Sequence, residues 1–153
     1  MKIAFAAWSA VTNVNFTEVL KDGNIKIDFF RGEHGDGHSF DGQGKILAHT
    51  LLSPYRLVHF DLDEKWAFMN VADLSRYDSI DILSVAIHEI GHVLGLNHSR
   101  EKDSIMSAIY HQPLNANGGY IKPKITAFDI LSAQQSFGTE KVEKRGGKMR
   151  EKA

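Results

Sequence analysis

The chain has 153 residues, 42% of them hydrophobic, and a formal net charge of −1. A chain of this length is expected to build one hydrophobic core, and no apolar run approaches the length needed to span a membrane. Residues 1–139 hold twelve basic and sixteen acidic residues, which favours cation binding and argues against nucleic-acid binding, while the absence of cysteine excludes disulfides.

Hydrophobic periodicity predicts several short strands in the first half of the chain. Residues 1–10 have the pattern of the end of an amphipathic helix. Alternation at Ile25, Ile27 and Phe29 predicts a half-buried strand over residues 25–30. Further strands are predicted at residues 46–52 and 57–61, with a weak one at residues 66–71. No internal repeat is visible.

Two longer helices are predicted in the second half. The first covers residues 81–96, with Asp78 or Ser79 as its N-cap. The second covers residues 126–137, with Thr126 as N-cap and Asp129 in its first turn. Residues 140–153 hold six basic and three acidic residues without an apolar period, so we expect a solvated charged tail.

The first of these helices carries the most informative motif, H-E-x-x-H-x-x-G-x-x-H, at residues 88–98. His88 and His92 lie one turn apart on a helix and can bind one ion. On a straight helix His98 would lie roughly 9 Å further along the axis, so the chain must turn back, and Gly95 can adopt the left-handed conformation that such a turn needs. Three His ligands leave a fourth position for water, as in a catalytic zinc site, and Glu89 can take a proton from that water.

The alternative interpretation of a bare H-E-x-x-H is an ordinary helix with exposed histidines. The additional glycine and third histidine at fixed spacing favour the zinc site. Met106 follows His98 by eight residues, where this type of site places a methionine under the zinc. A methionine alone would more often belong to the hydrophobic core.

Residues 31–45 contain five glycines with several Asp and His residues. No packed element has this composition, so we expect a loop that is organised by something other than apolar burial.

These motifs, together with Trp8-Ser9-Ala10-Val11-Thr12 and Leu47-Ala48-His49, resemble the matrixins, the matrix metalloproteinase family of zinc endopeptidases. The resemblance runs from about residue 4 to residue 138, and Ser99 directly after the third histidine fits it better than the astacins or adamalysins. It implies an α+β fold of the metzincin or zincin-like type, with a small twisted mixed sheet, an active-site helix and a C-terminal helix. The catalytic domain would be residues 1–139.

The resemblance also implies further metal sites. His34, Asp36, His49 and His59 match the ligands of a structural zinc. Six further residues match the family's calcium site, to which they would contribute oxygen ligands: Asp41, Gly42, Gly44, Ile46, Asp61 and Glu64. The alternative is that these polar residues form a solvated loop. His38 and His111 match no ligand position and are interpreted as surface histidines.

For the substrate, the resemblance implies a protein or peptide of extracellular-matrix type, bound in an extended conformation by a monomeric extracellular enzyme. The carbonyl of Ala48 would meet the substrate backbone, and Tyr110 would flank the pocket for a hydrophobic side chain. The implied activity is zinc- and calcium-dependent peptide hydrolysis.

The chain also departs from the family pattern. The segment between His49 and His59 is short, and residues for a second calcium ion are missing. Ala108 replaces a proline of the pocket wall, and Phe128 replaces the first aspartate of a pair whose second member is retained as Asp129. The chain starts in the middle of the family's first helix, without the inhibitory pro-segment. These departures motivate an alternative: a catalytically silent metal-binding or interaction module, or a truncated gene product of a matrixin.

Overall fold

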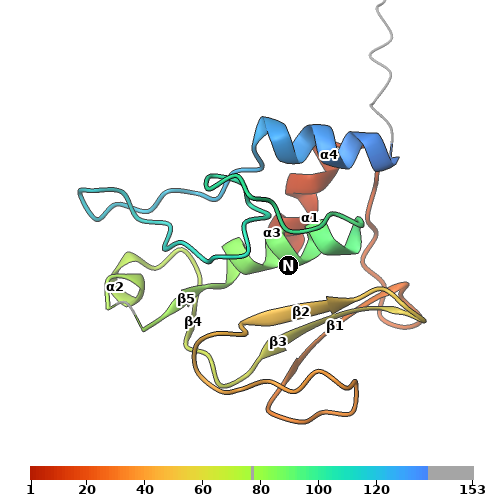
Figure 1. Ribbon diagram of the computed structural model, residues 1–153, viewed down its shortest axis with the longest axis horizontal. Helices are drawn as coiled ribbons and strands as arrows, with labels where there is room; N and C mark the ends of the chain where they lie inside the picture. The colour runs from red at the N-terminus through yellow and green to blue at the C-terminus, as the bar shows by residue number, and fades with distance from the viewer. Residues whose placement is uncertain (77, 138–153) are drawn as a thin grey trace, which may run out of the picture.

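A three-stranded mixed sheet lies below the long central helix in the computed structural model (Figure 1), which describes residues 1–76 and 78–137. The elements in chain order are α1 (Lys2–Ser9), β1 (Ile25–Phe30), β2 (Ala48–Leu51), β3 (Arg56–Asp61), β4 (Trp66–Ala67), α2 (Val71–Leu74), β5 (Ile80–Asp81), α3 (Ile82–Val93) and α4 (Ala127–Phe137). The mixture of helices with a small mixed sheet confirms the predicted α+β class. The charged tail predicted at residues 140–153 lies outside the described residues.

β3 is the centre of the sheet, parallel to β1 and antiparallel to β2, so β2 forms an edge. Both faces of β3 are buried. Val58 and Phe60 belong to the hydrophobic core, whereas the alternate residue His59 contacts Asp36 of the glycine-rich loop. Because side chains of a strand alternate between the two faces of a sheet, one face packs against the helices and the other faces the glycine-rich loop.

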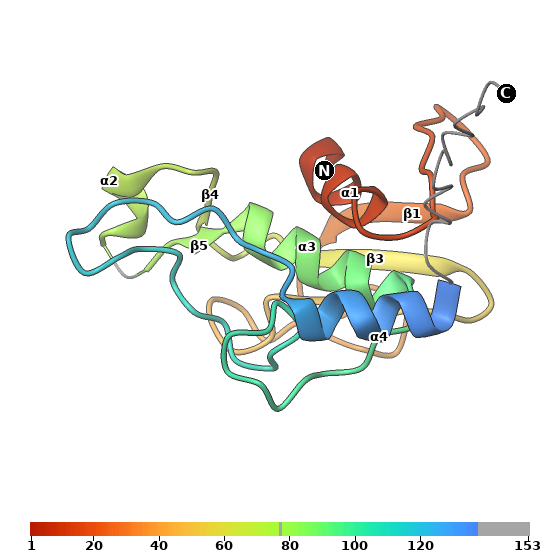
Figure 2. The same ribbon diagram turned by 90° about the horizontal axis from the view of Figure 1, so that it is seen from above.

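The core forms where α3 packs on the sheet and on α1. Ala4 and Trp8 of α1 lie one turn apart and are fully buried. The indole Nε1 of Trp8 donates a hydrogen bond to the carbonyl of Ile87 at 2.8 Å, which fixes α1 on the middle of α3. Figure 2 shows α1 and α4 on either side of α3 when the molecule is seen from above.

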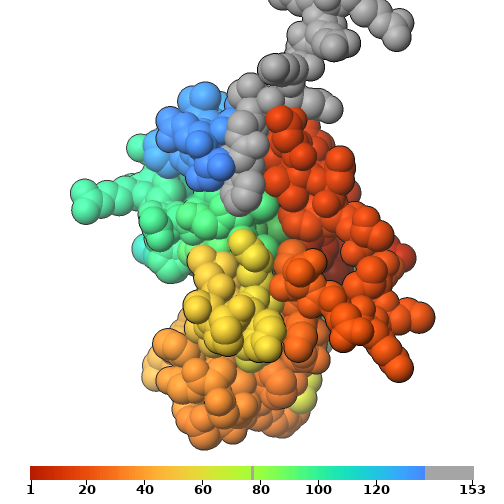
Figure 3. Space-filling view, turned by 90° about the vertical axis from the view of Figure 1, so that its right-hand side faces the viewer, coloured from red at the N-terminus to blue at the C-terminus, as the bar shows by residue number. Residues whose placement is uncertain are grey.

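The glycine-rich loop forms the end of the molecule opposite α4, as the orange and blue regions of Figure 3 show. Five of its glycines have positive φ, for example Gly42 at 83° and Gly44 at 90°. Side chains are disfavoured there, which explains the glycine content of a loop that curves tightly. No helix in the described part of the chain is long and apolar enough to cross a membrane.

Several predicted boundaries are wrong for local reasons. The strand expected at residues 66–71 ends at Ala67, because the side chain of Asn70 accepts hydrogen bonds from the amides of Ala72 and Asp73 and starts α2. The N-cap of α3 is Asp81 rather than Asp78 or Ser79, and the helix ends at Val93.

The shift of this N-cap follows from β5, because its residues stay extended while they pair with β4. The Asp81 carboxylate then accepts from the amide of Ser84 at 3.0 Å. At α4 the prediction holds, because the Thr126 hydroxyl accepts from the amide of Asp129 at 3.3 Å.

Candidate metal centres

The end of α3 brings the three motif histidines together. Gly95 has a φ of 82°, and two hydrogen bonds close the helix end: the Leu96 amide to the Gly91 carbonyl at 3.0 Å and the Gly95 amide to the His92 carbonyl at 2.7 Å. This is the Schellman arrangement, which reverses the chain direction. His98 therefore returns to the face of α3 that carries His88 and His92, as the sequence predicts.

The three imidazoles point their Nε2 atoms at a common position. Nε2 of His88 lies 3.0 Å from Nε2 of His92 and 3.3 Å from Nε2 of His98. On the other side of the rings, Nδ1 of His88 lies 2.8 Å from the carbonyl of Ile105, and Nδ1 of His92 lies 2.7 Å from the carbonyl of Leu96. A carbonyl only accepts, so each Nδ1 carries the hydrogen and each Nε2 presents a bare lone pair.

This donor set fits a divalent cation. Burial, followed by the neighbouring imidazoles, lowers the pKa of His88 to about 4, and burial also lowers the pKa of His92. Both rings are therefore neutral near pH 7, which is the form that binds zinc. Lone pairs 3.0 Å apart repel one another unless a cation lies between them.

Glu89 lies beside this cluster and is buried, with 4% of its surface exposed. Burial raises its pKa to about 7, against the opposing effect of a hydrogen bond from the Thr50 hydroxyl to Oε2 at 2.7 Å. Thr50 lies on β2, so the bond joins the sheet edge to α3. A carboxyl group with a pKa near neutrality can both take and return a proton. Sequence reasoning did not identify Thr50, because the contact spans 39 residues.

The segment after His98 packs against α3. Met106 is buried, and a Cβ built at Gly91 would lie 2.3 Å from its sulfur atom. The carboxylate of Asp129 on α4 accepts hydrogen bonds from the Ser104 hydroxyl and from the Ile105 amide at 3.2 Å. The segment that presents the Ile105 carbonyl to His88 is therefore held in place by α4.

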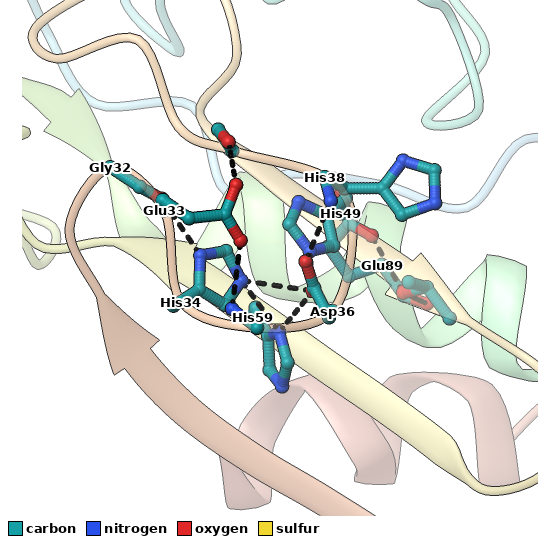
Figure 4. Close-up of polar contacts among 11 residues, drawn as sticks. Gly32, Glu33, His34, Asp36, His38, His49, His59 and Glu89 are labelled. Carbon is teal, nitrogen blue, oxygen red and sulfur yellow. Dashed lines mark hydrogen bonds and ion pairs between the residues drawn. The ribbon is translucent and has the colours of Figure 1, made fainter.

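A second cluster lies between the glycine-rich loop and the outer face of the sheet. Figure 4 shows the Asp36 carboxylate reaching three imidazole rings. Its Oδ2 atom is 2.9 Å from Nε2 of His34, 2.7 Å from Nε2 of His49 and 2.8 Å from Nδ1 of His59. The structure therefore brings together all four residues predicted from the sequence.

The electrostatics of the second cluster also suit a cation. Burial would raise the pKa of Asp36, but the amide of His38 and the rings of His49 and His59 outweigh it and hold this pKa well below its usual range. Burial lowers the pKa of His49. An ionised carboxylate is the form of Asp36 that a closed zinc site with three nitrogens and one oxygen requires.

Acidic residues lie next to the second cluster. Asp61 is fully buried, and its Oδ2 atom has no hydrogen-bond partner among the described residues. Burial, with the nearby charges of Asp61, Asp41 and Asp63, raises the pKa of Glu64 although the Gly44 amide opposes it. A buried carboxylate oxygen without a donor is costly unless a cation is bound, and hard oxygen ligands suit calcium.

A cleft of about 1020 Å³ includes the first cluster. Its lining residues include Ala48 and Thr50 of β2, His88 and Glu89 of α3, and Tyr110. Burial raises the pKa of Tyr110 to about 12, and its hydroxyl accepts from the Asp81 amide at 2.8 Å. The predicted pocket residue is thus anchored to the N-cap of α3.

The chain is similar to one protein family over most of its length and to several curated proteins. Residues 1–138 match the family model described as Matrixin. Matrix metalloproteinase-C of Caenorhabditis elegans is 38% identical over 137 residues, which is 88% of this chain and 24% of that protein. Metalloendoproteinase 2-MMP of Arabidopsis thaliana is 47% identical over 139 residues, 88% of this chain and 35% of that protein.

Stromelysin-3 of Homo sapiens is 44% identical over 114 residues, 72% of this chain and 22% of that protein. The chain spans between about a quarter and two fifths of the length of the first curated relatives that it matches.

Proposed function

Because the chain belongs to the matrixin family, we propose that it is a zinc-dependent endopeptidase domain that hydrolyses peptide bonds. The observation that carries this proposal is the convergence of three imidazoles, two of which are held with a bare Nε2 atom, beside a buried carboxyl group with a pKa near 7. His88, His92 and His98 would hold the zinc. A zinc ion at this position supplies Lewis acidity, which polarises the scissile carbonyl and acidifies a water.

The protein's own groups perform the proton transfers. Glu89 takes a proton from the attacking water and returns it to the departing amine. The carbonyls of Ile105 and Leu96 keep the histidine rings in the ligand tautomer throughout. Thr50 holds the Glu89 side chain against the edge strand between these two transfers.

The position of β2 supports an extended peptide substrate. This strand is a sheet edge along the cleft, so an extended chain can add to it through main-chain hydrogen bonds, including one to the carbonyl of Ala48. A hydrophobic side chain would enter the part of the cleft next to Tyr110. On the basis of the family we propose proteins of extracellular-matrix type as substrates, an extracellular location and a monomeric domain.

We further propose that the second cluster binds a structural zinc and the adjacent acidic group binds calcium. His34 and Asp36 come from the loop, while His49 and His59 come from β2 and β3, so the ion would join loop and sheet. The calcium ligands would be the carboxylates of Asp41, Asp61 and Glu64, with the carbonyls of Gly42, Gly44 and Ile46.

The test is cleavage of a quenched gelatin-like peptide by zinc-loaded protein, with and without a chelator. We expect chelator-sensitive cleavage, and we expect Glu89→Ala to bind zinc normally while losing most turnover. Zinc binding at the first cluster without cleavage of any peptide would support the silent module instead. Near wild-type turnover by Glu89→Ala would contradict the proposed role of this carboxyl group.

A further inference from the structure

The cleft carries a charge opposite to that of the domain around it. Residues 1–139 have more acidic than basic residues, yet four of their twelve Lys and Arg residues line the cleft, compared with two of their sixteen Asp and Glu residues. The four are Lys45, Lys102, Lys122 and Lys124. The two carboxyl groups are the buried Glu89 and the exposed Asp103.

Three of these lysines are exposed and lack a counter-charge. Lys45 lies 3.6 Å from Asp41, but within residues 1–76 and 78–137 no ion pair involves Lys102, Lys122 or Lys124. Their positive charges are therefore free to attract a ligand in the cleft.

The backbone that carries Lys122 and Lys124 is anchored at both ends. Before them, the Ile121 amide donates to the Pro113 carbonyl at 2.8 Å, and the Tyr120 hydroxyl donates to the Asp81 carboxylate at 3.0 Å. After them, the Thr126 amide donates to the Asp129 carboxylate at 2.9 Å.

Asp129 also accepts from the Ile105 amide, close in sequence to Lys102. The two lysine-bearing segments are thus fixed relative to α3 and to each other, and both line the cleft that Tyr110 also lines.

We propose that these lysines make the cleft selective for peptides with acidic side chains near the hydrophobic residue that enters beside Tyr110. The proposal deepens the proposed peptidase function and rests on it. A polyanion such as a sulfated polysaccharide would also be attracted by lysines, but these lysines line the same cleft as β2 and Glu89, in which the proposed peptide substrate would lie. Exposed ion pairs of this kind change an equilibrium by about 1.4- to 5-fold each.

The experiment compares peptides that differ only by Glu, Gln or Lys at each of the positions that follow the scissile bond. Cleavage is measured with zinc-loaded protein, and binding of the same labelled peptides is measured by fluorescence anisotropy with Glu89→Ala. We expect KM and Kd to be lowest for Glu at one or two positions, by about 1.4- to 5-fold relative to Gln for each lysine engaged. The preference should shrink in 1 M salt, where the Debye length falls to about 3 Å.

The double variant Lys122→Glu/Lys124→Glu should invert the preference, so that the Lys peptide binds best. The matched control is Lys21→Glu/Lys26→Glu, which changes the net charge equally at exposed positions outside the cleft. This control should keep the preference for Glu.

Equal binding of all three peptides would overturn the proposal, and so would a preference that survives in the cleft variant or is lost in the control. Tight binding of heparin that depends on the same lysines, without any effect of peptide charge, would also overturn it. Failure of the peptidase function has a different signature: no peptide is cleaved, while the binding measurement still reports the charge preference.

Discussion

Gly91→Ala tests whether the methionine-containing segment is packed tightly against α3. A Cβ at residue 91 would lie 2.3 Å from the sulfur of Met106 and 3.0 Å from Cζ2 of Trp8. Favourable contacts between such atoms lie near 3.5–4.0 Å, so a neighbour must withdraw by more than about 1 Å. Trp8 cannot withdraw easily, because it is fully buried and its Nε1 is bonded to Ile87. Met106 is also buried, so the strain falls on its segment.

The expected destabilisation follows from two opposing effects. Overpacking of a core costs about 1–3 kcal/mol, whereas replacing glycine by alanine inside a helix gains about 1 kcal/mol. Because a contact of 2.3 Å is severe, the cost falls in the upper part of this range, about 2–3 kcal/mol, and the net loss is about 1–2 kcal/mol. This corresponds to a Tm lower by about 2–8 °C for a domain of this size. Displacement of Met106 would also move the neighbouring Ile105 carbonyl away from His88, and zinc affinity should fall by about 10-fold or more.

Urea denaturation of the metal-free protein measures the stability change without the contribution of bound zinc, and zinc titration measures the affinity separately. The double variant Gly91→Ala/Met106→Ala completes the cycle. If the contact with the sulfur is the cause, the added methyl group should cost at least 1 kcal/mol less in the Met106→Ala background. An unchanged or higher midpoint for Gly91→Ala, or additive effects in the cycle, would refute the packing argument.

Three further predictions concern buried groups near the metal sites. Thr50→Val should lower kcat by about tenfold or more with little change in KM, because the hydrogen bond to the Glu89 carboxylate is lost. Thr50→Ser keeps the hydroxyl and should restore kcat. Equal kcat values for the Val and Ser variants would contradict a role of the hydroxyl in positioning Glu89. Asp61→Asn should stabilise the protein in excess chelator, because it replaces a buried carboxylate whose Oδ2 atom has no hydrogen-bond donor among the described residues, while Oδ1 accepts from the Asp63 amide. The substitution should also abolish stabilisation by calcium, and an unchanged calcium-dependent Tm shift would exclude Asp61 as a ligand. In metal-free protein the pKa of Glu89 in the folded state is about 7, above its ordinary value of 4.5. The stability of the wild type relative to Glu89→Gln should therefore be greatest below pH 4.5 and decline by on the order of 2–3 kcal/mol as pH rises through 7. A constant difference in stability between pH 4 and pH 8 would show that the carboxyl group is not buried as described.

Sequence reasoning predicted the site more accurately than the element boundaries. The histidines converge because their positions follow from helix periodicity and from a left-handed glycine, both of which are local properties of the chain. The start of α3 was misplaced because β5 depends on pairing with β4, which no local pattern encodes. The same holds for Asn70, whose capping side chain ends a segment that is apolar enough to suggest a strand.

Contacts between residues that lie far apart in the sequence were also not predicted. The Thr50–Glu89 hydrogen bond and the Tyr110–Asp81 hydrogen bond each require the tertiary fold to be known. For Thr50 a signal existed in principle. It follows His49 in a strand, so once His49 is assigned to the loop-facing side, alternation places Thr50 on the side of α3.

This alternation makes β2 a physical connection between the two histidine clusters. His49 reaches Asp36 on the outer face of the sheet, and the next residue, Thr50, reaches Glu89 on the inner face. β2 has one neighbouring strand, because it is the sheet edge, so its position depends on contacts made by its side chains as well as on its ladder with β3. An ion in the second cluster would add bonds to His49 and hold the edge strand in place. The structural site would thereby position the carboxyl group on which the proposed chemistry depends, through two consecutive residues of a single strand.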